Sequence, residues 1–327
     1  MAAYDILWHL FVSVSHMRSK DLLSITDLES HEIRLLLADA ANMKAEGWQT
    51  TLSGKTLALL FEKPSLRTRV SFELAMKQLG GEAIYLSPAE VGLGKRESIA
   101  DVARVLSRYV DALAVRTYAQ SGLEELARRS KIPVINALSD DEHPCQALAD
   151  LLTIYEHKGD YPGLKLAYIG DGNNVAVSLA LAAASVGLSI TIASPKGYEI
   201  PSGVMKQVLK TASDNDSSVE MTTSPEVAAR GADIIYTDVW ISMGQEDEAE
   251  KRLNDFNGYQ VNERILALAK SDAIIMHPLP AHYGQEVAQG LLDSQQSVVF
   301  DQAENRLHVQ KALLADMLGG LLLPWPA

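Results

Sequence analysis

Cysteine is almost absent from this sequence, and basic residues are scarce relative to acidic ones. The single Cys145 cannot form a disulfide within the chain, and it is compatible with a reducing compartment, so we expect a cytoplasmic protein. The 29 Lys and Arg stand against 42 Asp and Glu, a formal net charge of −13. A nucleic-acid-binding surface needs clustered basic residues, so no nucleic-acid partner is expected. A locally basic pocket for a small anion is still compatible with an acidic chain.

Long hydrophobic segments of the membrane type are missing as well. Residues 1–16 contain no Lys or Arg and include Asp5, so they lack the basic start of a signal peptide. We expect them to be a dispensable extension, with Met17 as the natural start. The uncharged run over residues 175–193 is interrupted by Gly187, with Ala and Leu before it and "LSITIAS" after it. This change in composition predicts a buried helix, a turn and a strand, and no membrane contact.

Strand-like runs alternate with helical patterns along the rest of the chain, and the series restarts after the turn-rich residues 159–163. The predicted strands are Thr56–Phe61, Ala83–Leu86, Ala112–Arg116, Val134–Leu138, Leu166–Ile169, Ile190–Ala193, Val219–Thr222, Ile234–Thr237 and Ala273–Met276. This alternation predicts an α/β fold with two doubly wound parallel-sheet domains and flanking helices. A final helical pattern over residues 307–318 is compatible with packing on either domain.

Polar clusters follow the predicted strands, at the edge where ligands of open parallel sheets bind. In the first half these are Ser65, Arg67 and Thr68, then Arg116, then "SDDEHPCQ". In the second half they are "GDGNN", "DVWISMG" and "HPLP". The sequence therefore predicts one polar site built from the carboxyl ends of both sheets.

The segment "FEKPSLRTRVSFE" begins a helix directly after a strand. Ser65 is suited to cap this helix, whose free N–H groups and dipole attract an anion. Arginine is unfavourable in a first helical turn, so Arg67 and Arg69 are best explained by a bound anion between them. The two-pronged guanidinium of Arg67 suits phosphate oxygens. The alternative is a capped helix whose arginines are solvated.

The segment "EHPCQALADLL" predicts a second helix start, with Pro144 in the first helical position. His143 would then lie beside a positive helix end, which favours a neutral imidazole that can donate to a substrate carbonyl. Gln146 lies one turn further and could face the same pocket. A purely structural histidine is an equally good interpretation at this point.

The segment "GDGNNVAVS" resembles a dinucleotide-binding turn but lacks its third glycine. A nicotinamide-dependent oxidoreductase is therefore only an alternative hypothesis. Asn173 and Asn174 are better suited to hydrogen-bond a polar substrate.

Taken together, these motifs resemble those of aspartate/ornithine carbamoyltransferases. "SLRTR", "HPCQALADLLT", "GDGNNVAVS", "DVWISMGQE", "MHPLPAH" and "FDQAENRLHVQKALL" occur in the order seen in that family, from about residue 18 to the end of the chain. "DVWISMGQE" and "FDQAENR" are most similar to ornithine carbamoyltransferases. The resemblance implies a carbamoyl phosphate-binding domain over residues 18–158, completed by a C-terminal helix at 303–320 that packs back on it. Residues 159–302 would form the ornithine-binding domain.

The resemblance also implies a reaction and its site residues. The δ-amine of ornithine would attack the carbamoyl carbon, releasing phosphate and forming citrulline without a metal or an organic cofactor. Arg67, Arg116 and His143 would act in catalysis, and Asp238 would pair with the α-ammonium of ornithine. Aspartate and putrescine are alternative acceptors. The implied carbamoyl phosphate-binding residues are Ser65, Leu66 (through its backbone), Arg67, Thr68, Arg116, His143, Gln146, Pro278, Leu279 and Arg306, and the implied ornithine-binding residues are Asn174, Asp238, Ser242 and Met243.

The resemblance further implies a homotrimer, or a multiple of one, in which the loop "GLGKRES" enters a neighbouring subunit's site with Lys95 or Arg96. Three positions depart from the family pattern. Gly92 stands where a glutamine for the neighbouring site is frequent, and Leu66 stands where threonine is usual. Pro278 replaces the cysteine of many ornithine enzymes and also occurs in aspartate carbamoyltransferases.

Overall fold

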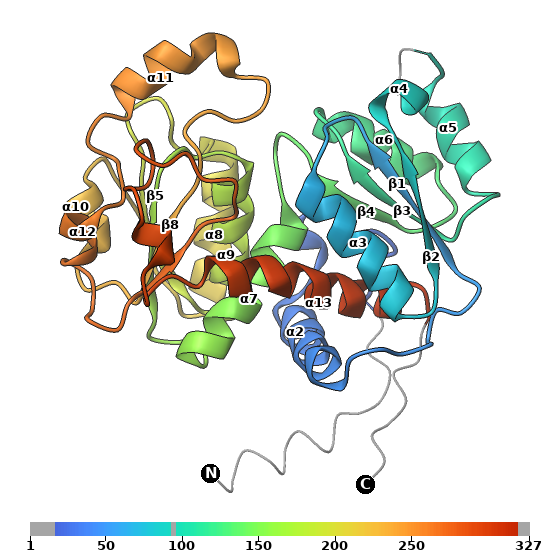
Figure 1. Ribbon diagram of the computed structural model, residues 1–327, viewed down its shortest axis with the longest axis horizontal. Helices are drawn as coiled ribbons and strands as arrows, with labels where there is room; N and C mark the ends of the chain where they lie inside the picture. Colours follow the sequence, from blue (N-terminus) through green and yellow to red (C-terminus); the bar gives the residue numbers. More distant parts are fainter. Residues whose placement is uncertain (1–16, 93–95, 320–327) are drawn as a thin grey trace, which may run out of the picture.

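The protein contains two parallel β-sheets with flanking helices, as the computed structural model describes for residues 17–92 and 96–319 (Figure 1). The first sheet has the strand order β2-β1-β3-β4 and the second the order β7-β6-β5-β8-β9, with every neighbouring pair parallel. The strands are β1 (Thr56–Phe61), β2 (Glu82–Leu86), β3 (Ala112–Arg116), β4 (Val134–Leu138), β5 (Lys165–Ile169), β6 (Ser189–Ala193), β7 (Val219–Thr222), β8 (Ile234–Thr237) and β9 (Ile274–Met276). The predicted α/β class is confirmed.

All the predicted strands are present, and their ends differ by at most one residue from the prediction. Strands β2, β5 and β6 each begin one residue earlier, at Glu82, Lys165 and Ser189. These first residues are polar, so a search for apolar runs cannot detect them. Strand β9 begins one residue later, because the N–H of Ala273 is bonded to Lys270 in a turn (N···O 2.9 Å).

Helices connect the strands and cover the sheets. They are α2 (Ser30–Glu46), α3 (Leu66–Gln78), α4 (Pro88–Val91), α5 (Ile99–Leu106), α6 (Gln120–Arg129), α7 (Pro144–Lys158), α8 (Asn174–Val186), α9 (Ser202–Asp214), α10 (Pro225–Ala229), α11 (Ala249–Asp255), α12 (Glu263–Leu266) and α13 (Val299–Met317), with short 3-10 turns at Ile25–Asp27, Glu246–Glu248 and Leu291–Asp293. The uncharged run after residue 174 forms α8, a left-handed turn at Gly187 (φ 83°) and β6, which confirms that prediction. Among residues 17–92 and 96–319, no helix has the length and apolarity needed to cross a membrane. The expected extension, residues 1–16, lies outside the described residues.

Helix α13, late in the chain, packs against α2, which is early in the chain. It also packs against α3 and α7, and Figure 1 shows it running from the second sheet to the first half of the molecule. The packing on the first half was expected, but the helix begins at Val299 rather than at 303. Its first turn is held by Gln302, which is fully buried and donates its N–H to the Val298 carbonyl (2.9 Å). This turn reads Val-Phe-Asp-Gln, in which a polar residue is the one that is fully buried with Val299, so hydrophobic periodicity did not reveal it.

The strand orders place one switch point in each sheet. Successive strands depart in opposite directions from the gap between β1 and β3, and again from the gap between β5 and β8. Ligands of open α/β sheets bind beyond the carboxyl ends of the strands at such a gap. The residues after β1 and β3, and those after β5 and β8, are therefore the ones that the fold offers to a ligand.

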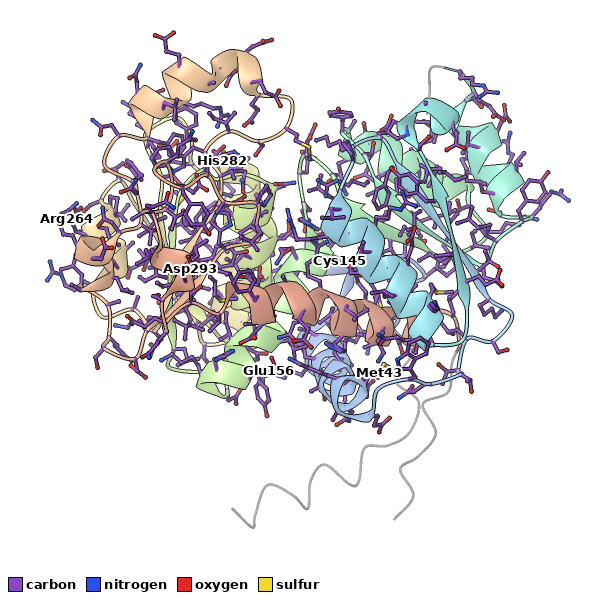
Figure 2. The ribbon with its side chains drawn as sticks, viewed as in Figure 1. Met43, Cys145, Glu156, Arg264, His282 and Asp293 are labelled. Carbon is purple, nitrogen blue, oxygen red and sulfur yellow. The ribbon has the colours of Figure 1, made fainter. Side chains whose placement is uncertain are left out.

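One buried lysine fastens α13 to the end of α2. Lys311 is fully buried, and its ammonium donates to the carbonyls of Met43 (3.0 Å), in the last turn of α2, and Gly47 (2.8 Å), the residue that caps it. The Met43 carbonyl also accepts the Gly47 N–H (3.2 Å). Figure 2 labels Met43 where α2 meets α13. This contact fixes the helix that carries Arg306.

We expect Lys311→Met to destabilise the fold by about 1–3 kcal/mol, because the Gly47 carbonyl loses this donor and the Met43 carbonyl loses one of its two donors, while the volume of the side chain is nearly kept. Denaturant unfolding measures this free energy. Lys206→Met is the control, since Lys206 is an exposed lysine on α9. Equal stability of the two variants would show that the Lys311 contact contributes nothing.

Candidate functional site

A cavity of about 1180 Å³ lies between the two halves, at the carboxyl ends of both sheets. It brings together predicted site residues that are far apart in the sequence. Its lining includes Ser65, Leu66, Arg67, Arg116, His143, Gln146, Asn174, Asp238, Ser242, Met243, Pro278, Leu279 and Arg306. Of the predicted residues, Thr68 lies directly behind this lining, because it is fully buried and its hydroxyl accepts from Arg306 (2.6 Å).

The turn between β1 and α3 forms one wall of the cavity. Ser65 caps α3, as predicted: its hydroxyl accepts from the Thr68 N–H (3.3 Å) and lies 3.0 Å from the Thr68 hydroxyl. Arg67 lines the cavity, whereas Arg69 does not. Arg69 pairs with Glu73 (2.8 Å) and stacks on the Tyr85 ring (4.0 Å), so the expectation of an anion between the two arginines is wrong for Arg69.

Three guanidinium groups converge on the cavity floor. They come from α3 (Arg67), from the end of β3 (Arg116) and from α13 (Arg306). Burial, followed by the repulsion of Arg306 and Arg67, lowers the pKa of Arg116 to about 10, and burial above all lowers the pKa of Arg306 to about 10. Within the described residues, none of the three is within ion-pair distance of a carboxylate, and Nε of both Arg116 and Arg306 has no hydrogen-bond partner. The floor is an unneutralised positive surface.

His143 stands at the N-cap of α7, with Pro144 in the first helical position as predicted. Its backbone N–H donates to the hydroxyl of Ser178 (2.8 Å), which fixes this turn against α8. The pKa of His143 lies well below its usual value, chiefly because of burial and then because of Arg306 and Arg116. The expectation of a neutral imidazole is thus confirmed, but burial and the two arginines cause it.

Gln146 and the segment after β9 contribute uncharged groups to the same floor. The Gln146 amide donates to Asp150 (2.9 Å), while its buried Oε1 has no partner among residues 17–92 and 96–319. Pro278 and Leu279 line the cavity, and the N–H of Leu279 donates to Nδ1 of the buried His277 (2.9 Å). The floor thereby combines cationic donors with an unpaired carbonyl oxygen.

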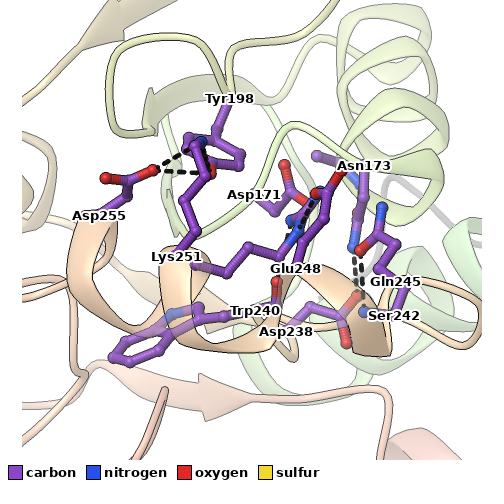
Figure 3. Close-up of polar contacts among 12 residues, drawn as sticks. Asp171, Asn173, Tyr198, Asp238, Trp240, Ser242, Gln245, Glu248, Lys251 and Asp255 are labelled. Carbon is purple, nitrogen blue, oxygen red and sulfur yellow. Dashed lines mark hydrogen bonds and ion pairs between the residues drawn. The ribbon is translucent and has the colours of Figure 1, made fainter.

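The second half supplies a carboxylate, Asp238, just after β8. Its Oδ2 accepts from the Asn173 amide (2.8 Å), and Figure 3 shows the two side chains facing each other. Burial raises the pKa of Asp238, although the nearby His277 imidazole and the Asn173 hydrogen bond oppose this. A cationic ligand beside Asp238 would relieve this destabilisation.

The two asparagines of "GDGNN" have partners of their own. Asn173 caps α8 by accepting from the N–H groups of Val175 (3.0 Å) and Ala176 (3.1 Å). Asn173 also lines the cavity, and through its bond to Asp238 it positions that carboxylate. Asn174 lines the cavity and donates to the Ser139 carbonyl (2.6 Å).

A loop after β8 borders the same side of the cavity. The N–H of Ser242 donates to Oε1 of Gln245 (3.0 Å), and the N–H of Gly244 donates to Glu246 (2.9 Å). Met243 has 46% of its surface exposed although it lines the cavity. These local hydrogen bonds hold the loop from Ser242 to Glu246 at the edge of the cavity.

Several charged residues of the lining were not predicted, among them Lys63 and Arg252. Lys63 is buried, contacts Asp140 (2.5 Å) and lies over the Tyr118 ring (4.2 Å). Its place directly after β1 could have revealed it. Arg252 pairs with Asp171 (2.7 Å), and no feature of the α11 sequence marks it in advance.

Of the loop expected to serve a neighbouring subunit, the described residues Gly92 and Arg96 are not part of the cavity lining. Arg96 is exposed, and Lys95 lies outside the described residues. Gly92 ends α4 in a left-handed conformation (φ 47°), which a glutamine would adopt only with strain. The departure at Gly92 therefore has a local structural reason.

Comparisons with known proteins agree with the arrangement of the two halves. Residues 20–156 match the carbamoyl-P binding domain of the aspartate/ornithine carbamoyltransferase family, and residues 162–317 match its Asp/Orn binding domain. The chain is 53% identical to the ornithine carbamoyltransferase of Anoxybacillus flavithermus over 306 residues, which is 92% of this chain and 98% of that protein. It is 50% identical to the anabolic ornithine carbamoyltransferase of Pyrococcus furiosus over 314 residues, 94% of this chain and 99% of that protein.

Solved structures give the same result. The ornithine carbamoyltransferase from Pyrococcus furiosus superposes with a TM-score of 0.91 at 50% identity, covering 94% of this chain and 99% of that one. The enzyme from Thermus thermophilus superposes with a TM-score of 0.84 at 47% identity, covering 92% and 99%.

The unneutralised floor predicts that inorganic phosphate raises the melting temperature of the protein, because the anion binds only the folded state. Arg67→Met should abolish most of this shift. Arg69→Met is a matched control, since Arg69 is in the same helical turn but outside the cavity. Differential scanning fluorimetry gives all three shifts, and equal shifts in the two variants would mean that Arg67 binds no anion.

Proposed function

Because the chain belongs to the aspartate/ornithine carbamoyltransferase family, we propose that it transfers the carbamoyl group of carbamoyl phosphate to the δ-amine of L-ornithine, giving L-citrulline and phosphate. The observation that carries this proposal is the meeting of Arg67, Arg116 and Arg306 without a carboxylate. Such a floor needs an anion to balance it. The name of the Pyrococcus furiosus relative supports a role in arginine biosynthesis.

The donor would occupy the floor. Its phosphate would be held by Ser65, the backbone of Leu66, Arg67 and Thr68, where the start of α3 adds free N–H groups. Arg306 adds a further cation, and it already touches Thr68 (2.6 Å). Leu66 stands where threonine is usual in the family, and it would contribute only its backbone N–H. The phosphate site therefore has one side-chain hydroxyl fewer.

The carbamoyl group would lie between the floor and the segment after β9. Thr68, Arg116 and the neutral His143 would donate to its carbonyl oxygen, on which negative charge develops during attack. Its amine would meet acceptors: Oε1 of Gln146 and the carbonyls of Pro278 and Leu279. This use of backbone oxygens needs no side chain at residue 278, so the proline there is compatible with the reaction.

The acceptor would enter from the second half. Asp238 is the partner for the α-ammonium, in a charge-assisted bond, with Asn174, Ser242 and Met243 around the amino-acid end. The lone pair of the δ-amine forms the new C–N bond, the C–O bond to phosphate breaks, and phosphate leaves with that electron pair. The attacking nitrogen gives one proton to the departing phosphate, so citrulline is neutral at the new urea group.

The binding of the donor by one half and of the acceptor by the other supports two domains. Residues 18–158 with helix α13 (Val299–Met317) would bind carbamoyl phosphate, and the residues from 159 up to that helix would bind ornithine. The two family matches, at 20–156 and 162–317, support a boundary in the turn after α7.

The proposal includes a cytoplasmic homotrimer with shared sites. An apolar surface on α3 and the edge strand β2 supports self-association: Val70, Leu74 and Ile84 are 42%, 38% and 48% exposed. The loop with Lys95 and Arg96 would reach the neighbouring carbamoyl phosphate site and add positive charge there.

The acceptor site predicts that ornithine is strongly preferred over aspartate, putrescine and lysine. Putrescine lacks the α-carboxylate, and aspartate carries a second anionic group and lacks the δ-amine. Citrulline and the corresponding products are measured with carbamoyl phosphate and each amine in turn. Faster turnover of aspartate than of ornithine would contradict this assignment.

Asp238→Asn should cost roughly 2 kcal/mol or more of transition-state binding, the scale for losing a buried charged hydrogen bond. The value follows from kcat/KM for ornithine. The phosphate-induced thermal shift is the control, and it should be unchanged because the floor is intact. Unchanged kcat/KM would remove Asp238 from the acceptor site.

Subunit mixing tests the shared site. Arg67→Ala and the double variant Lys95→Ala with Arg96→Ala should each be nearly inactive alone. In trimers reassembled from equal amounts, about a quarter of the sites should combine an intact Arg67 with an intact neighbouring loop, since each interface pairs two chains at random. No recovery after verified exchange, or an active loop variant, would show that the loop is only a surface feature.

A further inference from the structure

Asp150 is a fully buried carboxylate that has no role in the reaction as described so far. It lies on α7, one helical turn after Gln146, and three donors surround it. Oδ1 accepts from the amides of Gln146 (2.9 Å) and Gln302 (2.7 Å), and Oδ2 accepts from the hydroxyl of Tyr236 (3.0 Å). Because these donors come from α7, α13 and β8, one carboxylate joins both halves beneath the cavity.

The chemistry of a carboxylate dictates how the two glutamines are turned. An ionised carboxylate only accepts, so each amide must direct its NH₂ group toward Asp150 and its oxygen away. In Gln146 this leaves Oε1 unpartnered among the described residues that line the floor. In Gln302 the oxygen accepts the N–H of His277 (2.8 Å), the residue before Pro278.

Both consequences concern the same part of the substrate. Gln146 Oε1 and the backbone after His277 are the acceptors assigned above to the carbamoyl amine. If the Gln146 amide were rotated by 180°, the floor would present its NH₂ group toward the NH₂ group of the carbamoyl donor. If the Gln302 amide were rotated, Gln302 would lose its bond to His277. The orientation of these acceptors thus depends on Asp150.

We propose that Asp150 is a positioning residue that sets donor specificity, by making the cavity present only acceptors to the amine of the carbamoyl group. This inference rests on the proposed function. It predicts rejection of acetyl phosphate, which has the same phosphate and carbonyl but a methyl group in place of the amine. A methyl group would leave the buried acceptors unpaired.

The charge on Asp150 is sensitive to pH near neutrality. Burial raises its pKa to about 7, against the opposing effects of its three hydrogen bonds and of Arg306. The charged or titratable groups that act on it are Arg306 on α13 and Tyr236 on β8. Below this pKa the protonated carboxyl becomes a donor and competes with the surrounding N–H groups, so the preference for the carbamoyl donor should fall as the pH falls.

The test compares Asp150→Leu with Asp150→Asn. Leucine removes both acceptors at similar volume. Asparagine keeps one oxygen for the two amides, and its NH₂ faces Tyr236, whose hydroxyl can turn to accept it. The measured quantity is the ratio of the inhibition constant of acetyl phosphate to the KM of carbamoyl phosphate.

We expect Asp150→Leu to lower this ratio about tenfold or more, the scale of a lost buried hydrogen bond, and Asp150→Asn to keep most of it. The parent's ratio should fall from about pH 8 to about pH 6, whereas that of Asp150→Asn should stay constant because it cannot titrate there. A purely structural role would lower stability and activity without changing the ratio.

Inorganic phosphate binding, measured by thermal shift, shows whether each variant still has an intact floor. A phosphate-binding Asp150→Leu variant with the parent's ratio would overturn the proposal. Should that variant fail to fold, a ratio in Asp150→Asn that varies with pH like the parent's would overturn it instead. A parent that makes no citrulline from carbamoyl phosphate and ornithine would contradict the proposed function, which is a separate result.

Discussion

Three guanidinium groups that meet with no carboxylate at ion-pair distance among the described residues are the constraint on which the rest of the molecule depends. Burial lowers the pKa of each, and repulsion by another arginine adds to this for Arg116 and Arg306, so the surrounding structure must hold them together. They come from three distant elements, and Arg306 is near the end of the chain. Helix α13 must therefore cross from the second sheet to the first half, where Lys311 and the packing on α2, α3 and α7 fix it.

The same crossing explains why the site lies between the halves rather than within one sheet. Each sheet has a single switch point, and α13 and α7 bring the two switch points to a common cavity. Asp150 tightens this arrangement, since it binds α7, α13 and β8 through one pair of oxygens. The first half thus provides the cationic floor and the second half provides the carboxylate.

Much of this could be predicted from the sequence, for a physical reason. Buried parallel strands are short apolar runs, so their positions were found to within one residue, and polar clusters directly after them marked the site. Arg67 and Arg69 could not be distinguished, because their directions depend on Glu73 and Tyr85, which belong to the folded structure. Arg306 and Asp238 were identified only through the family resemblance. Arg252 and the Asp150 network were missed, since nothing local in their sequence indicates their partners.

Charge separation between the halves keeps the cavity available to ligands. Arg252 and Asp171, both in the second half, pair at 2.7 Å and neutralise each other. Burial lowers the pKa of Arg116 and raises the pKa of Asp238, and neither has an ion-pair partner among the residues that the structure describes. An anionic donor would reverse the first shift and a cationic acceptor the second, so each half has the charge that is complementary to one substrate. Pairing of Asp238 with the arginines would remove this complementarity, and the placement of these residues on opposite sides of the cavity prevents it.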